Sequence, residues 1–395
     1  MPTSPCGTPS DDARAAATEG ASRPSVAVLG LRGVPASWGG VERQCEELYV
    51  RLAEAGFPIT VFCRATYVPA GLRRYKGIRC LRLPTIAGKH LEAFVHTFLA
   101  CCCLPFIAAD IVHVYSQGPA LFTPLIRLLA PRSRIFFTCG GLDWQRRKWS
   151  RPASALLRLG EWCSARLTDR CIMVSQALTA YYRDRYGVDS LTIPNGVTIP
   201  MAGRPLGDLA RLGLASGGYA LFVGRLVPEK RIEDLVAVFR RDRRGKKLVI
   251  AGGTAGSNDY AAHLREEAAG DEAVVFAGYR FGEELEALFA NATCYVTASE
   301  LEGLPLSLLE GMAAGLPCLA SDIPPHREVL GPTGSYFPVG DTVRLAAALD
   351  ALTGVGPAAL AALGAACRER AAREFSWDTV ARRLGEAYCA AMAGR

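Results

Sequence analysis

The chain has 395 residues, more than one hydrophobic core usually holds, and this length favours two domains. Hydrophobic residues make up 50% of it and charged residues 21%, which fits a soluble globular protein. The net charge of +7 is uneven, because residues 1–200 hold 24 Lys and Arg against 14 Asp and Glu. A basic N-terminal half favours an anionic partner such as a membrane surface or a lipid diphosphate. No Lys/Arg-rich helix or aromatic–basic repeat accompanies the charge, so a nucleic-acid partner is disfavoured.

Cysteines and the first residues exclude further classes. The 14 cysteines include no CxxC pair, which argues against a zinc site or dithiol chemistry, and we expect no metal. Most lie in apolar contexts and are expected to be small core residues. Residues 1–23 are rich in Ser, Pro, Ala and Gly and lack the apolar segment of a secretory signal, so we expect a disordered leader.

A first series of alternating strands and helices follows the leader. The strand 25–29 ends in a Gly- and Pro-containing loop, and helix 41–55 follows Gly39 and Gly40. Glycines at a helix start permit close approach of a ligand to the backbone, although a flexible loop explains them equally well. The loop lacks the GxGxxG spacing, so a nicotinamide oxidoreductase is disfavoured. Further strands are expected at 59–63, 78–83, 111–115, 134–138, 171–174 and 191–197, with a helix at 153–168.

Two segments of this half favour a surface role. Residues 91–109 are apolar but shorter than a bilayer span, so we expect a buried or surface-lying helix, with a membrane-facing helix as the alternative. The strand 134–138 runs into Cys139-Gly140-Gly141-Leu142-Asp143-Trp144 and then a basic–aromatic loop. That loop suits an acidic acceptor or a lipid headgroup, or is a solvated charge run.

A second series begins after the Pro- and Gly-rich residues 199–216, which are expected to form a linker. The strand 220–223 ends in Gly224-Arg225-Leu226-Val227-Pro228-Glu229-Lys230, where two cations five residues apart suit a diphosphate. Helices are expected at 232–240 and 283–290, and strands at 247–251, 274–277 and 293–297. Three helices are expected in the tail, at 341–352, 357–373 and 376–393, the last capped by Ser376.

The most informative stretch of the chain is 299–321. Glu302 and Glu310 flank the start of a helix expected at 306–314, and a strand at 317–321 follows. Unpaired N–H groups at that helix start attract phosphate, and the carboxylates accept hydrogen bonds from sugar hydroxyls. The competing interpretation is an ordinary βαβ unit with surface glutamates.

Two alternating series predict an α/β protein with two doubly wound, Rossmann-like parallel sheets that face a cleft. We expect an N-terminal domain at 24–198 and a C-terminal domain at 217–374. Residues 375–395 are expected to form a final helix. Ligands of such sheets bind at the carboxyl ends of the strands, where the loops described above lie.

With these residues in view, the chain resembles the retaining glycosyltransferases of family 4, which have the GT-B fold. The resemblance rests on the motif from Glu302 to Glu310 together with that from Gly224 to Lys230. Pro194-Asn195-Gly196-Val197 and Phe375-Ser376-Trp377 match as well. The segment Arg-Gly-Val-Pro-Ala-Ser-Trp-Gly-Gly-Val-Glu, which ends at Glu42, is similar to a bacterial subgroup of polysaccharide-assembly sugar transferases. In this fold the last helix crosses back to the N-terminal domain.

The resemblance implies a role for each matching residue. Arg225 and Lys230 would bind the donor diphosphate, Glu310 the ribose hydroxyls, and Glu302 the transferred sugar. Arg225, Lys230 and Glu302 are the expected catalytic residues. The other expected donor contacts are Gly39, Gly40, Gly224, Gly278, Gly303 and Leu304, and the expected acceptor contacts are Asp143 and Trp144. Relatives carry His in a His-Gly-Leu-Asp-Trp segment, whereas this chain has Gly140, which puts a histidine's role there in doubt.

These expectations combine into transfer of a hexosyl group, with retention, from a nucleotide diphosphate sugar to a saccharide or lipid-linked hydroxyl acceptor. No cofactor is expected beyond the donor substrate. The expected location is the cytoplasm or the inner face of the plasma membrane. The alternatives are a sugar-nucleotide epimerase, a glycogen-type synthase, and a non-catalytic carbohydrate- or lipid-binding scaffold.

Overall fold

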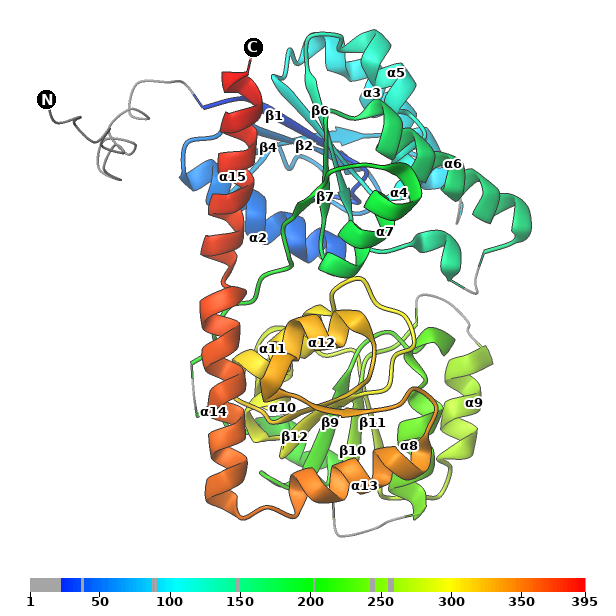
Figure 1. The fold of residues 1–395 in the computed structure, drawn as a ribbon, viewed down its shortest axis with the longest axis vertical. Coiled ribbons are helices and arrows are strands. Elements are labelled where there is room, and N and C mark those ends of the chain that lie inside the picture. The colour runs from blue at the N-terminus through cyan, green and yellow to red at the C-terminus, as the bar shows by residue number, and fades with distance from the viewer. Residues whose placement is uncertain are drawn as a thin grey trace, which may run out of the picture.

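The computed structural model describes residues 23–36, 39–86, 88, 91–146, 149–201, 203–241, 246–254 and 259–394. The expected leader, apart from Arg23, lies outside the described residues, as do Arg147 and Lys148 of the basic–aromatic loop. Two α/β units, each a largely parallel sheet with helices on its faces, lie one above the other in Figure 1. The predicted fold class is confirmed.

The N-terminal sheet has the strand order β3-β4-β2-β1-β5-β6-β7-β8. Every neighbouring pair is parallel except β3 with β4. The central strands β1, β2 and β5 are buried at every residue, as expected for strands covered on both faces. The strands are β1 (Val26–Leu29), β2 (Ile59–Arg64), β3 (Arg74–Tyr75), β4 (Ile78–Leu83), β5 (Ile111–Tyr115), β6 (Arg134–Cys139), β7 (Arg170–Met173) and β8 (Leu191–Thr192).

The helices of this unit include several that the apolar pattern did not predict. The apolar segment 91–109 is not one helix, because α3 ends at Cys103 and Pro105 lies in the 3-10 turn η1 (Leu104–Phe106). The short helices α4 and α5, and α7, have too few periodic apolar residues to be recognised in the sequence. The helices are α2 (Gly40–Glu54), α3 (Leu91–Cys103), α4 (Gln117–Ala120), α5 (Thr123–Leu129), α6 (Arg151–Leu167) and α7 (Gln176–Tyr186), with the 3-10 turn η2 (Asp143–Gln145).

The C-terminal sheet has the order β11-β10-β9-β12-β13-β14, with all neighbours parallel. Its strands are β9 (Tyr219–Val223), β10 (Lys247–Ala251), β11 (Val274–Gly278), β12 (Cys294–Thr297), β13 (Cys318–Ser321) and β14 (Ser335–Phe337). Its helices are α8 (Ile232–Arg241), α9 (Asp259–Glu267), α10 (Gly282–Asn291), α11 (Leu306–Ala313), α12 (Pro324–Leu330) and α13 (Thr342–Thr353), with the 3-10 turns η4 (Pro228–Lys230) and η5 (Gly331–Thr333). The segment expected as a linker contains the 3-10 helix η3 (Gly207–Leu212).

Two long helices run along one side of both units in Figure 1. The helix α14 (Pro357–Glu374) packs against α11, and α15 (Trp377–Ala393) packs against α2 of the N-terminal unit. The Ser376 hydroxyl accepts a hydrogen bond from the Thr379 N–H, so the predicted N-cap is confirmed. No single helix within the described residues is long and apolar enough to span a membrane, whereas α13 and α14, bent by 107°, meet that criterion as a pair.

A buried polar cluster joins α15 to the N-terminal sheet. His113 Nδ1 lies 2.9 Å from the Tyr49 hydroxyl and 2.5 Å from that of Tyr388, while its Nε2 lies 2.7 Å from Thr138 Oγ1. Burial lowers the pKa of His113 to about 3, so its ring is neutral at physiological pH. The cluster thus satisfies polar groups from α2, β5, β6 and α15 at once, and it fixes where α15 lies.

This cluster predicts a specific loss of stability. Tyr388→Phe removes the hydroxyl that contacts His113 and Tyr49 and leaves buried polar atoms with fewer partners. We expect the free energy of unfolding to fall by about 1–3 kcal/mol in chemical denaturation. Tyr67→Phe, the same change on a half-buried ring, is the control, with an expected loss below about 0.5 kcal/mol. Equal effects of the two variants would contradict the role of the cluster.

Candidate active site between the two sheets

The loops after β9 and β12 meet because these strands are neighbours in the sheet. The first loop carries Arg225 and continues into η4, and the second carries Glu302 before α11. Lys230 Nζ donates to Glu302 Oε1, and only about an eighth of either side chain is exposed. The Glu300 N–H also donates to the Glu229 carbonyl at 3.0 Å, which fastens the loops together. The two motifs singled out in the sequence therefore form one charged pair.

Glu302 is held as a carboxylate. Burial raises its pKa, but the neighbouring Lys230 ammonium outweighs this effect, and the net shift is downward. A side-chain hydrogen bond from Ser299 acts in the same direction. Glu302 is thus an acceptor of hydrogen bonds and not an acid that donates a proton near neutral pH.

His326, on α12 just after the neighbouring strand β13, lies beside this pair. It is completely buried, and its Nδ1 lies 2.8 Å from the Ser321 carbonyl oxygen. Burial lowers its pKa, which the Glu302 charge opposes. The neutral ring that donates from Nδ1 leaves Nε2 as an acceptor, and Nε2 has no hydrogen-bond partner among the described residues. Because the whole ring is buried, His326 forms part of the packing beside Glu302 and not a surface open to a ligand.

The second carboxylate of the Glu302–Glu310 motif contacts the N-terminal unit. Glu310, on α11, accepts from Arg43 of α2, with 2.5 Å between Arg43 Nη1 and Glu310 Oε1. Burial raises the pKa of Glu310, and the Arg43 charge works against that increase. The Arg43 side chain is about half exposed, so water screens this pair more than the first one.

Residues 303–306, which lead into α11, contact the N-terminal unit at three places. Gly303 lies against the Gly140 carbonyl, where an added Cβ would overlap with the oxygen. Asn195 Nδ2 donates to the Leu304 carbonyl at 2.7 Å, and Leu306 lies against Gly40 at the start of α2. These contacts place Glu302 and Glu310 at the boundary between the two sheets.

A buried carboxylate supports the loop that ends with Trp144. Glu161 of α6 is 1% exposed and accepts hydrogen bonds from four neutral donors, which lie on Gln117, Trp144, Tyr181 and Tyr186. Gln117 in turn accepts from the Asp143 N–H at 3.0 Å, and Asp143 pairs with Arg146 at 3.2 Å. Arg158 lies 4.2 Å above the Trp144 ring. The two residues expected at the acceptor are therefore rigidly placed.

The remaining expected residues divide by position. Arg225 is exposed, and its charged neighbours come from both units, namely Asp143 and Arg146 on one side and Glu229 and Glu302 on the other. Gly224 lies beside Lys230, while Gly39 precedes α2 with a φ of +104°, which favours glycine. Gly278 ends β11, and β10 separates it from the loops that carry the charged pair. The Gly278 carbonyl nevertheless accepts from the Gly252 N–H, which lies against Gly224, and Tyr279 next to it lies near the Arg225 charge.

The sequence did not identify Arg43, Glu161 or His326 as parts of this region. Each acts through a partner far along the chain, and no local spacing signals such a contact. The place of His326 in the sequence was the one available signal. It follows β13, whose neighbour β12 precedes Glu302, and ligand sites of parallel sheets lie at the carboxyl ends of the strands.

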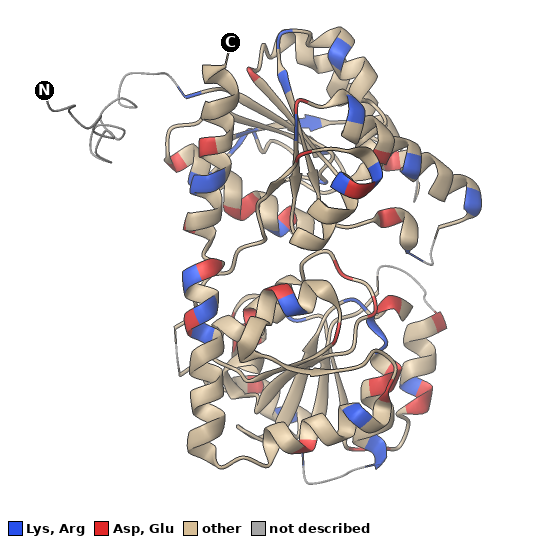
Figure 2. Cartoon of the chain, in the orientation of Figure 1, with Lys and Arg blue, Asp and Glu red and all other residues tan. Residues whose placement is uncertain are grey.

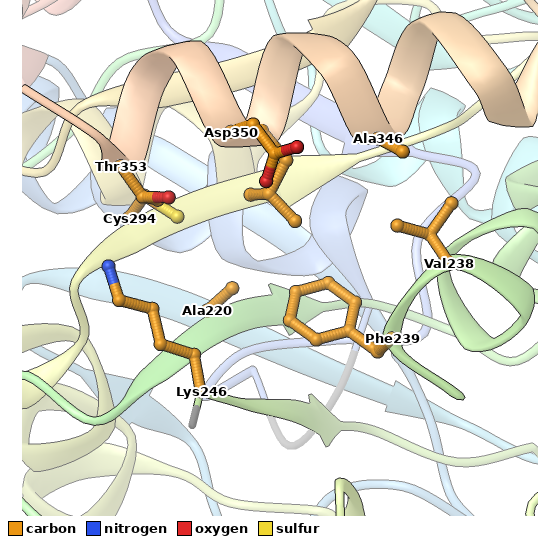
Figure 3. A pocket seen from close by; sticks show the side chains of 9 residues that line it. Ala220, Val238, Phe239, Lys246, Cys294, Ala346, Asp350 and Thr353 are labelled. Carbon is orange, nitrogen blue, oxygen red and sulfur yellow. The ribbon is translucent and has the colours of Figure 1, made fainter. Parts of the chain in front are cut away.

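A small cavity lies near the amino ends of β9 and β12, away from the charged loops. It lies beneath α13, is lined by residues including Ala220, Cys294 and Asp350 (Figure 3), and has a volume of about 30 Å³. This is space for about one water molecule, so it is no substrate site. Among the described residues, no group of three or more His, Cys, Asp or Glu side chains is placed to hold a metal ion.

Comparisons with known proteins agree with this geometry. The family described as "Glycosyltransferase Family 4" matches residues 38–199, and that described as "Glycosyl transferases group 1" matches residues 217–354. Among curated relatives, a glycogen synthase of Mycobacterium tuberculosis is 36% identical over 180 residues, which are 44% of this chain and 43% of that protein. The O-antigen chain mannosyltransferase B of Escherichia coli is 27% identical over 184 residues, 46% of this chain and 48% of that protein. The matches thus span about half of each relative.

Solved structures share the fold over nearly the whole chain. Sucrose-phosphate synthase of Thermosynechococcus elongatus has a TM-score of 0.81 at 24% identity and covers 94% of this chain and 100% of its own. HepE of Anabaena in complex with UDP-glucose has a TM-score of 0.77 at 17% identity, covering 93% and 100%. With one family model on each sheet and this shared architecture, the chain belongs to the GT-B glycosyltransferases of group 1 and family 4.

Proposed function

We propose that this protein is a retaining, metal-independent glycosyltransferase. It moves a hexosyl group from a nucleotide diphosphate sugar to a hydroxyl of a lipid-linked or growing saccharide, in polysaccharide or glycoconjugate biosynthesis. It works in the cytoplasm, peripherally on the inner face of the plasma membrane. The observation that carries the proposal is the pairing of Lys230 with Glu302 at the edge where Glu310 meets the N-terminal unit.

Charge at this edge suits a donor that is anionic at one end and rich in hydroxyls at the other. Lys230 and Arg225 provide positive charge for the diphosphate, and the N-terminus of α11 adds the unpaired N–H groups of its first turn. Glu310 accepts from the ribose, and Glu302 accepts from hydroxyls of the sugar. The carboxylate that Lys230 holds ionised is thus kept as an acceptor.

The chemical step breaks the bond between the anomeric carbon and the diphosphate oxygen and forms one to the acceptor oxygen on the same face. Negative charge grows on the departing diphosphate, so cations fixed beside it lower the barrier without a metal. The acceptor hydroxyl attacks from the side of the leaving group and gives its proton to the departing diphosphate oxygen, and no nucleophile of the protein takes part. Asp143 and Trp144 lie on the N-terminal side, where the acceptor enters.

The descriptions of two similar proteins mention nucleotide sugars, and these guide the choice of donor. The HepE structure contains UDP-glucose, and a relative of Mycobacterium tuberculosis, 34% identical over 122 residues, is named a GDP-mannose-dependent alpha-mannosyltransferase. Each supports a nucleotide sugar donor, and together they leave base and sugar to the experiment.

The proposal is tested by a thermal-shift screen of UDP-, GDP- and dTDP-sugars followed by transfer assays. A preferred donor at one hundred times its Kd stabilises the fold by about 2.7 kcal/mol. In Lys230→Met we expect that stabilisation to vanish and turnover to fall by about 10²–10³, because the leaving diphosphate loses a fixed cation. Lys230→Met alone leaves the Glu302 carboxylate buried and unpaired, which can destabilise the fold. The double variant Lys230→Met/Glu302→Gln removes that charge as well and is the control for folding.

Each alternative reading gives a different result in that experiment. If none of the nucleotide sugars stabilises the protein, the proposed donor site is wrong. Donor binding without transfer over a broad acceptor panel indicates a non-catalytic binding protein, and conversion of the nucleotide sugar without an acceptor indicates an epimerase. Unchanged turnover of Lys230→Met contradicts the role given to Lys230.

Arg43 is expected to tune Glu310 as the pH changes. Burial already raises the pKa of Glu310, and Arg43→Gln removes the charge that opposes the increase. More of the carboxyl is then protonated as the pH falls, and a protonated carboxyl is a poorer acceptor for the ribose. We expect kcat/KM for the donor to fall by about 3–10-fold, given the half-exposed Arg43, with a larger loss at pH 6 than at pH 8. A loss that does not change with pH would contradict this account.

Two glycines in contact provide a matched pair of variants. An added Cβ at Gly303 overlaps with the Gly140 carbonyl, whereas one at Gly140 meets only Val41, at 3.9 Å. We expect Gly303→Ala to lower kcat/KM by about tenfold or more, since misplacement by about 1 Å lowers rates strongly. Gly140→Ala should stay within about threefold of wild type, by the same reasoning applied to a site with room. If both variants behave alike, the contact does not position the site.

A further inference from the structure

One outward face of the N-terminal unit combines exposed apolar residues with arginines. We call it the α3–α6 face; it comprises the outward residues of α3, η1, α5 and α6. Phe106 of η1 is 89% exposed and Leu128 of α5 is 75% exposed. The other large apolar residues exposed here are Leu91, Phe94, Phe98, Leu156, Leu159 and Trp162. Such a concentration on one face differs from the scattered exposed apolar residues that ordinary surfaces carry.

The helix α6 shows the pattern most clearly. Its buried side consists of Leu157, Gly160, Glu161, Cys163 and Ser164. Its exposed positions are only apolar or cationic, and they are Arg151, Pro152, Ala155, Leu156, Arg158, Leu159, Trp162 and Arg166. Figure 2 shows the basic positions spaced along this helix. A helix with Trp and Leu beside Arg, lying along a surface, is typical of binding in the plane of a membrane interface.

Acidic side chains are directed away from the α3–α6 face. Between residues 91 and 168, no acidic residue that the structure describes is exposed. Each of them contacts a partner within the protein, namely Glu92 with Arg64, Asp110 with Ser25, Asp143 with Arg146, and Glu161 with Trp144. Among its described residues the face therefore presents positive charge without an exposed carboxylate, which suits an anionic partner.

The elements of this face are contiguous. The helix α5 contacts α3, η1 and α6, and Phe94 of α3 lies 4.7 Å, between ring centroids, from Phe122 at the start of α5. Figure 1 places α3, α5 and α6 on the same side of the N-terminal sheet. The exposed residues of these elements therefore belong to one continuous surface.

The face also adjoins the acceptor side of the site. The turn η2, with Asp143 and Trp144, comes just before α6, and Arg158 on the outer side of α6 stacks over Trp144. The 17 residues of α6 span about 25 Å, so the helix leads from that turn to the outer surface.

We infer that the α3–α6 face docks on the anionic surface of a lipid membrane, with Phe106, Leu128 and Trp162 entering the interface and the arginines of α6 contacting lipid phosphates. The inference rests on the proposed function only in supplying a lipid-linked acceptor, because the docking itself is measured without activity. It assigns the membrane contact to three helices and a turn that lie beside the expected acceptor residues.

Flotation of the full chain with phosphatidylcholine vesicles containing about 30% phosphatidylglycerol tests the inference. Phe106→Ser/Leu128→Ser removes two exposed apolar groups, and we expect the partition coefficient to fall at least about tenfold. For Arg151→Gln/Arg166→Gln we expect a fall of about 25-fold at low salt, since each cation near an anionic surface contributes about fivefold. The control Val343→Ser/Phe281→Ser removes exposed apolar groups of the C-terminal unit and should leave partitioning unchanged.

The outcomes separate docking from transfer. All three variants should unfold at the wild-type temperature and should use a soluble acceptor at the wild-type rate. Equal binding of wild type to pure phosphatidylcholine vesicles, or an equal loss in the control variant, would overturn the inference. So would a dimer in sedimentation equilibrium without lipid that Phe106→Ser/Leu128→Ser dissociates, because the face would then bind a second copy. Flotation that persists in a chain without transfer activity would refute the proposed function alone.

Discussion

The backbone contact between Gly303 and the Gly140 carbonyl determines how closely the carboxyl edges of the two sheets approach. No other residue type fits at position 303 without pushing the loops apart. Asn195 holds the next peptide through the Leu304 carbonyl, and Leu306 lies against Gly40. Because these contacts are short and involve backbone, they align the start of α11 with the start of α2. The ion pair of Arg43 with Glu310, which joins the two units, depends on this alignment.

Glu302 and Glu310 differ in whether their ion-pair partner lies in the same unit or in the other one. The pair of Lys230 with Glu302 lies within one unit and is mostly buried. The pair of Arg43 with Glu310 joins the units and forms only when they are close. Glu310 is buried, and the Arg43 charge from the other unit opposes the resulting rise in its pKa. The strength of Glu310 as a hydrogen-bond acceptor thus depends on the position of the N-terminal unit.

Much of the fold follows from the sequence because buried parallel strands are uninterrupted apolar runs followed by glycine-rich loops. The strands β2, β5 and β10 and the helices α2 and α6 were predicted within two residues of their observed bounds. The helix α7 escaped prediction because its apolar residues follow the helical period weakly and tertiary packing decides its structure. The motifs located Lys230 and Glu302, yet the partners Arg43, His326 and Glu161 emerged only in three dimensions. Each partner comes from a distant element, so no spacing along the chain predicts it.

Gly140 illustrates how a site changes without a change of fold. The family resemblance places a histidine at this position, but the contact with Gly303 uses only the backbone carbonyl. The residue is exposed, and its Cβ direction is open except for Val41, so a side chain there is free to vary without disturbing the approach of the two units. Glu161 meanwhile holds the loop through Trp144 and Gln117, independently of residue 140. The absence of an imidazole at residue 140 therefore leaves the architecture intact, and the buried ring of His326 is the histidine that lies beside Glu302.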